Sequence, residues 1–487
     1  MRGLKSFFRD TVIYGIAAVL PRLISIALIP IFTKVLLRSE FSDQTTWYVY
    51  AAFINVFLTM GLETAFFRYY TKEDDKNKVL SSAFIILTIS SATFALTGTL
   101  LASQICGFLG FNDPMFIKIL VWTTALDTLV VIPFALLRVS NRPVKFMIFK
   151  IFNVLVWFTL TYIFLLELPE MTLGNNFFNN SESLKSLTIP GVFPIIVANL
   201  MASLITLILF LPEILKIKWS IEKSIIQKLL KYGWPIMIGG LAYVINENAD
   251  KLIIQKLIDK NANGMYAACY KLGVFMTLYI TAFRMGAEPF FFNHADTADA
   301  TKKYSTIMTW FVIFGCIFMV FVVSFIDILA GILIRKTTYL PGLIIVPVIL
   351  LANLFSGIYN NLAIWYKLTD RTRIGMYISI SGAALTIILL FVLVPVFGIM
   401  GGAIATLITY VTMTCISYYV GNKHYPVGYE ARKILTYLFM ATWLCGLSFI
   451  LFRGNYIMSI LLIFLFILFI LWVENLKLEH LIRVIKN

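Results

Sequence analysis

The feature that most constrains this chain is a series of apolar segments separated by short charged loops. A helix needs about 20 mostly apolar residues to cross the hydrocarbon core of a bilayer. Fourteen segments have this length and composition, and they lie at 11–33, 47–69, 79–105, 116–137, 146–168, 192–212, 233–256, 265–288, 305–326, 342–364, 374–394, 400–420, 434–452 and 456–473. The pattern therefore predicts about fourteen transmembrane helices.

The composition agrees with this interpretation. Of the 487 residues, 60% are hydrophobic and only 13% are charged, whereas an average soluble domain has about 25% charged residues. In water such a chain would expose far more apolar surface than one core can bury. We therefore predict an all-α integral membrane protein, and we exclude a soluble enzyme and a nucleic-acid-binding domain.

Basic residues are unevenly distributed between alternate loops. One set of loops holds twenty-six Lys and Arg residues and the opposite set holds eight. Loops rich in Lys and Arg remain in the cytoplasm during membrane insertion. The pattern predicts that both termini are cytoplasmic, and it explains the net charge of +15 without any nucleic-acid partner.

The longest basic loop follows the sixth span. In this loop Ile225, Ile226, Leu229 and Leu230 recur at helical spacing among lysines, which is typical of an amphipathic helix on an anionic membrane surface. A Tyr-Ala-Ala sequence followed 16 residues later by Arg occurs in both the second and the eighth span, which suggests a repeat of six spans. The predicted organisation is an N-terminal lobe (1–212), a cytoplasmic linker helix (213–231), a C-terminal lobe (232–425), and two further spans with a tail (426–487).

Polar side chains inside the spans are the candidate functional residues, because a charge at a helix centre costs about 2.5–3.5 kcal/mol on insertion scales. Arg22 lies about eleven residues, or roughly 17 Å, into the first helix, which is near the bilayer midplane. The full set of bases, amides and acids singled out is Arg22, Lys271, Arg284, Asn246 and Asn353, together with Glu63, Asp127, Glu247, Asp250 and Glu288.

Several of these residues have a structural alternative. Arg284 and Glu288 form an i,i+4 pair, as do Glu247 and Lys251, and each pair could neutralise itself. That pairing would leave Asp250 without an obvious partner in its own helix.

Other candidates have alternatives that reach across helices or towards the membrane surface. Asp127 could be a structural counter-ion for Arg22, and Asn353 could join two helices through a hydrogen bond. Arg68 and Lys150 lie near the inner ends of their spans, where long basic side chains reach the interface. The spacing of the five Cys and three His residues fits no metal site, and there is no glycine-rich nucleotide loop.

Several segments carry a family resemblance. They are Tyr14-Gly15 with Pro21-Arg22 and Pro30, Gly61-Leu62-Glu63-Thr64-Ala65-Phe66-Phe67-Arg68, Tyr232-Gly233-Trp234-Pro235, Gly264-Met265-Tyr266, Ala287-Glu288-Pro289-Phe290-Phe291, Ile364-Trp365-Tyr366-Lys367-Leu368-Thr369-Asp370, and Val396-Phe397-Gly398. Through them the chain resembles the Wzx-like polysaccharide-biosynthesis flippases of the multidrug/oligosaccharidyl-lipid/polysaccharide (MOP, MATE-like) superfamily. Phe41-Ser42-Asp43 departs from the pattern, because relatives usually place a glycine-containing turn there.

The resemblance implies two six-helix lobes in a V around a central cavity, with two additional C-terminal helices. It implies a flippase rather than an enzyme, working by alternating access in the bacterial cytoplasmic (inner) membrane. The substrate would be an undecaprenyl-pyrophosphate-linked oligosaccharide for O-antigen, capsule or exopolysaccharide synthesis. Membrane lipids, a polysaccharide polymerase and glycosyltransferases are the partners it suggests.

With such a substrate, Arg22, Lys271 and Arg284 would bind the diphosphate, and Asn246 and Asn353 would bind polar groups. The acids Glu63, Asp127, Glu247, Asp250 and Glu288 would be candidates for coupling transport to H+ or Na+; no other cofactor is expected. Two alternatives stay open, namely a cation-coupled multidrug exporter of the same superfamily and a non-transport membrane scaffold of a glycan-assembly complex.

Overall fold

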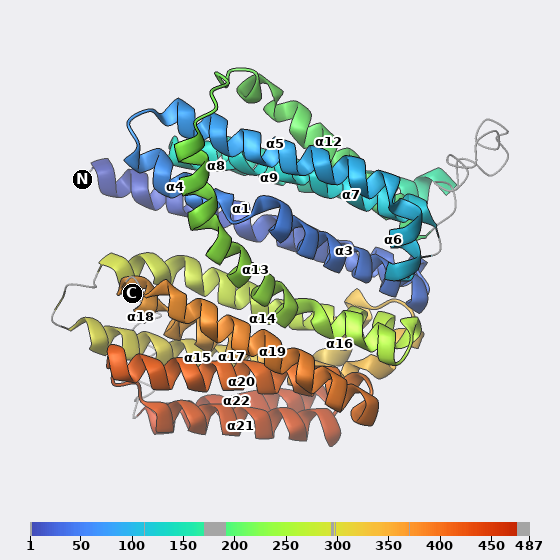
Figure 1. Ribbon diagram of the computed structural model, residues 1–487. Coiled ribbons are helices and arrows are strands. Elements are labelled where there is room, and N and C mark those ends of the chain that lie inside the picture. Colours follow the sequence, from blue (N-terminus) through green and yellow to red (C-terminus); the bar gives the residue numbers. More distant parts are fainter. Residues whose placement is uncertain are drawn as a thin grey trace. The chain divides into compact units, whose positions relative to one another are not determined.

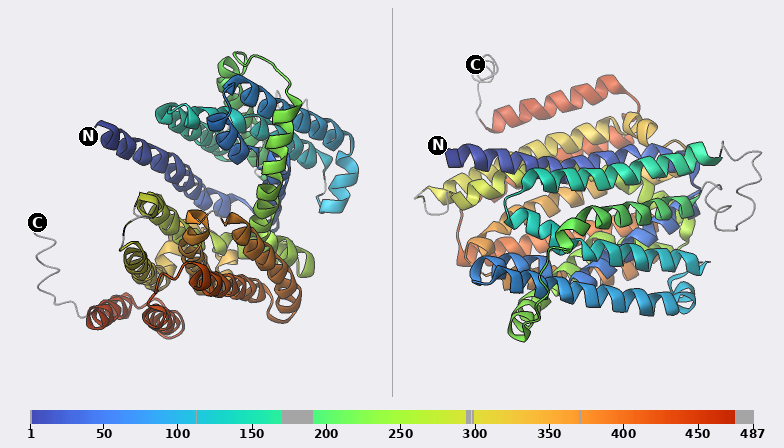
Figure 2. Two further views of the ribbon diagram at one scale, coloured as in Figure 1. Left: turned by 60° about the vertical axis from the view of Figure 1, so that its left-hand side comes forward. Right: turned by 90° about the horizontal axis from the view of Figure 1, so that it is seen from above.

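The computed structural model describes residues 2–111, 113–169, 191–293, 297, 299–369 and 371–474. Most of the outer loop expected at 169–190 and of the tail after Glu474 lies outside these residues. Every regular element in the described ranges is a helix (Figures 1 and 2). The predicted all-α fold is confirmed.

The chain forms two compact units, Met1–Ala267 and Ala268–Asn487. The helices of unit 1 are α1 (Arg2–Ala27), α2 (Ile29–Val35), α3 (Arg38–Thr59), α4 (Leu62–Lys72), α5 (Lys76–Leu100), α6 (Ala102–Leu109), α7 (Pro114–Leu129), α8 (Val131–Val139), α9 (Pro143–Tyr162) with a π-helical turn (Ile163–Glu167), α12 (Val192–Ile214), α13 (Lys223–Leu257) and the start of α14 (Lys260–Asn293). Within this unit α5 packs against α7, and α12 packs against α7 and α9. In Figure 1, α13 crosses these helices obliquely.

Unit 2 contains the rest of α14 and all later helices. These are α15 (Ala300–Ser324), α16 (Ile326–Leu333), a 3-10 helix (Thr337–Ile345), α17 (Val346–Leu362), α18 (Ile364–Leu368), α19 (Thr372–Phe397), α20 (Ile399–His424), α21 (Ala431–Ile450) and α22 (Tyr456–Val473). In this unit α20 packs against α17 and α19, while α15 packs against α17, α21 and α22. These helices run roughly parallel to one another in Figure 1.

Thirteen segments of the described chain are helical, long and apolar enough to cross a membrane. They correspond to the expected spans except for the seventh, at 233–256. There α13 is a continuous helix, but Asn246, Glu247, Asp250 and Lys251 make it too polar to meet the same standard. The architecture is therefore thirteen apolar spans and one polar helix.

The break between α3 and α4 is fixed by a close approach of α13. Met60 and Gly61 both adopt left-handed backbone conformations, which end α3 and start α4. A Cβ atom on Gly61 would lie 2.5 Å from the carbonyl oxygen of Gly233, and one on Gly233 would lie 2.3 Å from that of Met60. Only glycine permits this contact, because any side chain would force the two backbones apart.

The linker after the sixth span differs from the prediction. The chain is not helical from Lys216 to Glu222, and α13 begins at Lys223 and continues into the seventh expected span without a break. Ile225 and Leu229, expected to face the membrane surface, are buried in a core formed with residues of α4, α5 and α8. Their apolar stripe therefore packs against protein, and for this reason unit 1 extends beyond the predicted lobe boundary to include α13.

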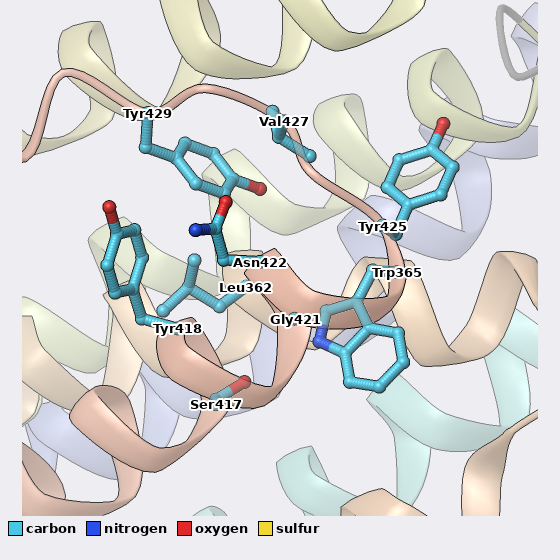
Figure 3. Close-up of a pocket in the computed structure, with 9 residues that line it drawn as sticks. All are labelled: Leu362, Trp365, Ser417, Tyr418, Gly421, Asn422, Tyr425, Val427 and Tyr429. Carbon is cyan, nitrogen blue, oxygen red and sulfur yellow. The ribbon is translucent and has the colours of Figure 1, made fainter.

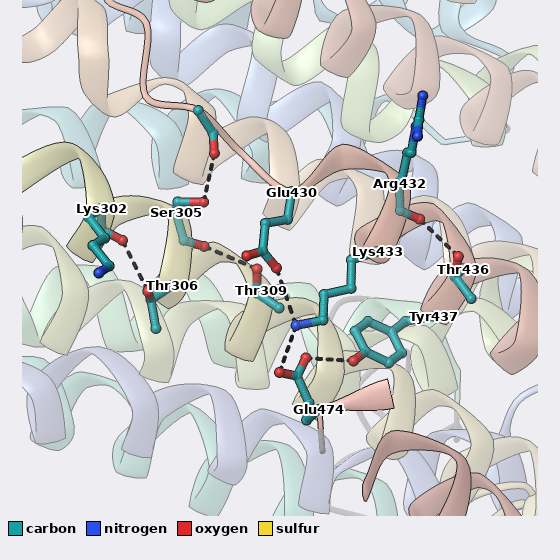
Figure 4. A network of polar contacts seen from close by, with 11 residues as sticks. Lys302, Ser305, Thr306, Thr309, Glu430, Arg432, Lys433, Thr436, Tyr437 and Glu474 are labelled. Carbon is teal, nitrogen blue, oxygen red and sulfur yellow. Dashed lines mark hydrogen bonds and ion pairs between the residues drawn. The ribbon is translucent and has the colours of Figure 1, made fainter. Parts of the chain in front are cut away.

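The two C-terminal helices pack against α15 of unit 2, and ion pairs at their ends join them to α16 and to each other. At one end Arg453 forms an ion pair with Asp327 on α16, with Nη2 and Oδ1 2.7 Å apart. At the other end Glu474 accepts hydrogen bonds from Lys433 (2.7 Å) and Tyr437 (2.6 Å), which joins α21 to the end of α22 (Figure 4). The predicted additional helices are thus an integral part of this unit.

Candidate functional site: a polar cavity in unit 1

A cavity of about 470 Å³ lies inside unit 1. Six helices line it, namely α3, α4, α7, α8, α9 and α12, through Asn55, Glu63, Asp127, Val130, Val131, Phe134, Arg138, Phe146, Lys150, Asn153 and Thr206. The helix is interrupted at Val130, between α7 and α8. Pro133 explains the break, because it has no N–H to donate to the carbonyl of Leu129.

Two acids and two bases face this cavity. Glu63, in the first turn of α4, accepts a hydrogen bond from Arg138 in the last turn of α8, with Oε1 and Nη1 2.8 Å apart. Lys150 on α9 and Asp127 on α7 line the same cavity and attract each other electrostatically. The cavity lining thus contains as many acidic as basic groups.

Aromatic rings support the two bases. The Lys150 Nζ lies 4.4 Å from the centroid of the Phe134 ring, and the Arg138 guanidinium carbon lies 4.8 Å from that of Phe67. Contacts of this kind stabilise a cation by about 0.5–2 kcal/mol. They also position each base independently of its acid.

Neutral polar groups complete the lining. The side-chain amide of Asn153 donates to the Thr206 hydroxyl (2.8 Å) and to the carbonyl of Ala202 (3.3 Å). Asn55 contributes a second amide to the cavity wall. Amides and hydroxyls both donate and accept hydrogen bonds, so this wall can bind the hydroxyl groups of a polar ligand.

Of the residues singled out in the sequence, Glu63 and Asp127 meet in this cavity. Arg138 and Lys150 were missed: Arg138 was counted as a loop residue, and Lys150 was expected to reach the membrane surface. A usable signal was that neither Glu63 nor Asp127 has a base at i±3 or i±4 in its own helix. Each acid therefore needed a base from another helix.

A second charged cluster lies on α13. Asp250 and Lys251 have side chains only 3% and 8% exposed, and their Oδ1 and Nζ atoms are 2.9 Å apart. Tyr266 donates a hydrogen bond to Asp250 Oδ2 (2.6 Å), and Lys251 Nζ donates to the Glu247 carbonyl (2.7 Å). The expectation that Asp250 lacks a partner in its own helix is wrong, because adjacent side chains can meet when the lysine folds back.

The other candidates of unit 1 are not among the described residues that line the cavity. Arg22 is exposed on α1, which packs against α9, and Asn246 is buried on α13. Both take part in interactions within the chain. Their predicted roles in binding remain predictions.

The remaining candidates belong to unit 2. Lys271 is half-buried and Arg284 exposed, both on α14, and the side chain of Glu288 lies outside the described residues. Asn353 on α17 is buried, and its amide donates to the Gly273 carbonyl of α14 (3.0 Å). This contact is the helix-joining arrangement offered as the structural alternative for Asn353.

Unit 2 contains a much smaller pocket of about 10 Å³ (Figure 3). It is lined by Leu362, Trp365, Ser417, Tyr418, Gly421, Asn422, Tyr425, Val427 and Tyr429. Within the described part of the chain, Trp365 Nε1 and Ser417 Oγ are buried without a hydrogen-bond partner. The His424 ring stacks on Trp365, with centroids 5.6 Å apart. A pocket of this size has room for about one water molecule.

The described residues include no group of three or more His, Cys, Asp or Glu side chains that could hold a metal ion. The groups of the polar cavity that can bind a ligand are its charged side chains, amides and hydroxyls. Its lining is polar and charged, and the chain around it has the spans of a multi-pass membrane protein.

Comparison with known proteins agrees with this class. Residues 7–293, more than half of the chain, match the family model described as polysaccharide biosynthesis protein. The chain belongs to this family, which confirms the family resemblance seen in the sequence.

Solved structures show the same fold at low sequence identity. The structure is similar to the lipid II flippase MurJ in an inward closed conformation, with a TM-score of 0.74 and 15% identity, covering 96% of this chain and 100% of that one. It is also similar to a multidrug resistance MATE family transporter of the MOP superfamily in an inward-facing conformation, with a TM-score of 0.63 and 12% identity, covering 82% and 94%.

One curated relative has a similar sequence. It is an uncharacterized membrane protein of Methanocaldococcus jannaschii, 25% identical over 192 residues. The match covers 39% of this chain and 44% of that protein, so less than half of the relative's length is represented.

Proposed function

We propose that this protein moves a lipid-linked oligosaccharide from the inner to the outer leaflet of the bacterial cytoplasmic membrane by alternating access. The glycan would enter O-antigen, capsule or exopolysaccharide synthesis. The observation that supports this proposal is the 470 Å³ cavity, in which ionic and amide groups lie among membrane-spanning helices.

The physical demands of the substrate explain why such a cavity is needed. An undecaprenyl-pyrophosphate-linked oligosaccharide combines an anionic diphosphate, a polar glycan and a long apolar tail. Moving the head through hydrocarbon without a polar cavity would strip it of its hydrogen bonds, at several kcal/mol for each unsatisfied group. Bases can bind the phosphates, and Asn55, Asn153 and Thr206 can bind sugar hydroxyls.

Further binding roles follow from the sequence. Arg22, Lys271 and Arg284 would contact the diphosphate at successive stages, and Asn246 and Asn353 would contact polar groups of the substrate. Arginine suits a diphosphate because its planar guanidinium can make two parallel hydrogen bonds to one phosphate.

Net movement in one direction needs a driving force. Consumption of the glycolipid by a polysaccharide polymerase or glycosyltransferase would provide one. A second possible driving force is the coupling of transport to H+ or Na+, since acids in membrane spans commonly serve as relays for ions. The acids that would couple transport are Glu63, Asp127, Glu247, Asp250 and Glu288. Both schemes are consistent with the predicted cytoplasmic position of the two termini.

The test is a glycolipid-translocation assay in proteoliposomes. Arg22→Ala should insert normally but abolish translocation, and Arg22→Lys should restore only part of it, because lysine keeps the charge without the planar fork. If Arg22 is instead a permanent counter-ion of Asp127, the double variant Arg22→Ala/Asp127→Asn should recover activity. That recovery would contradict a substrate-binding role for Arg22.

The second candidate is a cation-coupled multidrug exporter, and the two acids of the cavity favour it. Such an exporter would use Glu63 and Asp127 to bind organic cations. The same vesicles distinguish the candidates, because uptake of an organic cation without any glycolipid movement would support the exporter and contradict the flippase.

A further inference from the structure

The cavity of unit 1 neutralises its own charges. Its lining includes two acids, Glu63 and Asp127, and two bases, Arg138 and Lys150. Arg138 is hydrogen-bonded to Glu63, while Lys150 interacts electrostatically with Asp127 and more weakly with Glu63. The two positive charges of the lining are therefore balanced by two negative ones before an anion enters.

The bases have more freedom to leave these pairs than the acids. Asp127 has a short side chain on α7, so its carboxylate can move little without a shift of the helix. Arg138 and Lys150 have long side chains that are exposed to solvent, and both lie over aromatic rings that can hold a cation when its acid is released. The aromatic contacts lower the cost of separating each base from its acid.

We propose that the diphosphate of the lipid-linked substrate enters this cavity by an exchange of electrostatic partners: Arg138 leaves its ion pair with Glu63, Lys150 turns from Asp127, which lines the same cavity, and both bases bind phosphate oxygens. This inference rests on the proposed function and assigns the site at which the anionic group is held. Arg138 binds as a planar fork and Lys150 as a point charge.

The exchange has a consequence for affinity. When the bases bind phosphate, the two carboxylates stay behind as like charges beside the anion, and like charges brought together cost several kcal/mol. The acids therefore hold the affinity low, which lets the substrate leave on the other side. A site that retained its anion too tightly could not complete a transport cycle.

The experiment measures binding of inorganic pyrophosphate to the full-length protein in nanodiscs by titration calorimetry. Asp127→Asn should bind about tenfold or more tightly than the wild type, because it releases Lys150 and removes one like charge. Lys150→Gln and Arg138→Gln should each weaken binding at least about tenfold, whereas Lys150→Arg should retain most of it. Retention in Lys150→Arg shows that charge, rather than folding, is responsible.

The matched control is Lys145→Gln. Lys145 lies on the same helix and forms an ion pair with Glu213, but it does not line the cavity. Its substitution should leave pyrophosphate binding unchanged.

Equal or weaker binding by Asp127→Asn would overturn the exchange mechanism. A second result would also overturn it: the wild type binds tetraphenylphosphonium but not pyrophosphate, and Asp127→Asn loses the tetraphenylphosphonium binding. The cavity would then be a cation site. If pyrophosphate binds as expected but no glycolipid moves in proteoliposomes, the anion site stands and the proposed function fails. If glycolipid moves equally well in wild type, Lys150→Gln and Asp127→Asn, the function stands and this inference fails.

Discussion

The two units use polar groups in different ways. In unit 1, four charged side chains from different helices meet in a cavity. In unit 2, most of the described interhelical contacts between polar groups within the spans are neutral, such as Thr386 to Thr409 (3.0 Å) and Asn353 to Gly273 (3.0 Å). Its interhelical ion pairs, Arg453–Asp327 and Lys433–Glu474, lie at helix ends.

This difference separates a binding role from a scaffolding role. Neutral hydrogen bonds between helices are satisfied without exposing charge, and they fix the helices in one arrangement. Charged side chains that line a cavity can change partners. A ligand or water molecule that enters the cavity can form the hydrogen bonds that each charged group loses. We infer that the charged groups of unit 1 can exchange partners, whereas the neutral contacts of unit 2 hold its own helices in one arrangement.

The largest effect should come from the one charged pair of unit 1 that the structure describes as fully buried. Asp250→Ala would break the buried ion pair with Lys251 and the hydrogen bond from Tyr266, and breaking such a pair costs about 3–5 kcal/mol. We expect a large loss of membrane abundance and of thermal stability, measured by fluorescence-detected chromatography. The isosteric Asp250→Asn variant separates this role from ion coupling.

If Asp250→Asn has normal abundance but fails to move glycolipid, Asp250 serves transport in addition to folding. A double variant, Asp250→Ala/Lys251→Met, should recover much of the lost stability, since it removes both charges. Unchanged stability in Asp250→Ala alone would show that the pair is dispensable for folding. The buried pair on α13 would then not differ in its structural role from the charged groups of the cavity.

An intermediate effect is expected where α13 meets the break between α3 and α4. Gly233→Ala places a Cβ 2.3 Å from the Met60 carbonyl oxygen, and the resulting overpacking should cost about 1–3 kcal/mol. The melting temperature of the purified protein measures this effect. Gly107→Ala on α6 is the control, because a Cβ there meets nothing within 4 Å. Equal melting temperatures in the two variants would mean that the contact adjusts freely.

The smallest effect tests whether the packing of unit 2 includes water. We expect Ser417→Ala to lower stability by about 1 kcal/mol, because one water molecule in the 10 Å³ pocket would bridge Ser417 Oγ and Trp365 Nε1. A double-mutant cycle with Trp365→Phe should then be non-additive. In the control Ser91→Ala of unit 1, removal of another buried hydroxyl that has no partner among the described residues should not lower stability. A rise in stability for Ser417→Ala would show a dry pocket.

The sequence by itself determined the class of the protein and the approximate position of its spans. Span length is a local property, since about 20 apolar residues in succession are enough to cross a bilayer. The same local argument identified Glu63 and Asp127 as unusual acids, and both line the cavity. It could not predict that Ile225 and Leu229 pack against α4 and α5, because an amphipathic stripe suits a protein surface as well as a membrane.

Only the tertiary structure decided which groups meet. Glu63 pairs with Arg138, 75 residues further along the chain, and Asp127 lines the same cavity as Lys150 on the next long helix. Such pairs depend on the rotation and neighbours of each helix, which follow from packing over the whole unit. Helical spacing predicted a partner for Lys251 at Glu247, and the fold added the adjacent Asp250, whose carboxylate lies 2.9 Å from Lys251 Nζ. The charge of each residue was therefore readable from the sequence, while its partner, and with it the chemistry of the cavity, was set by how the helices pack.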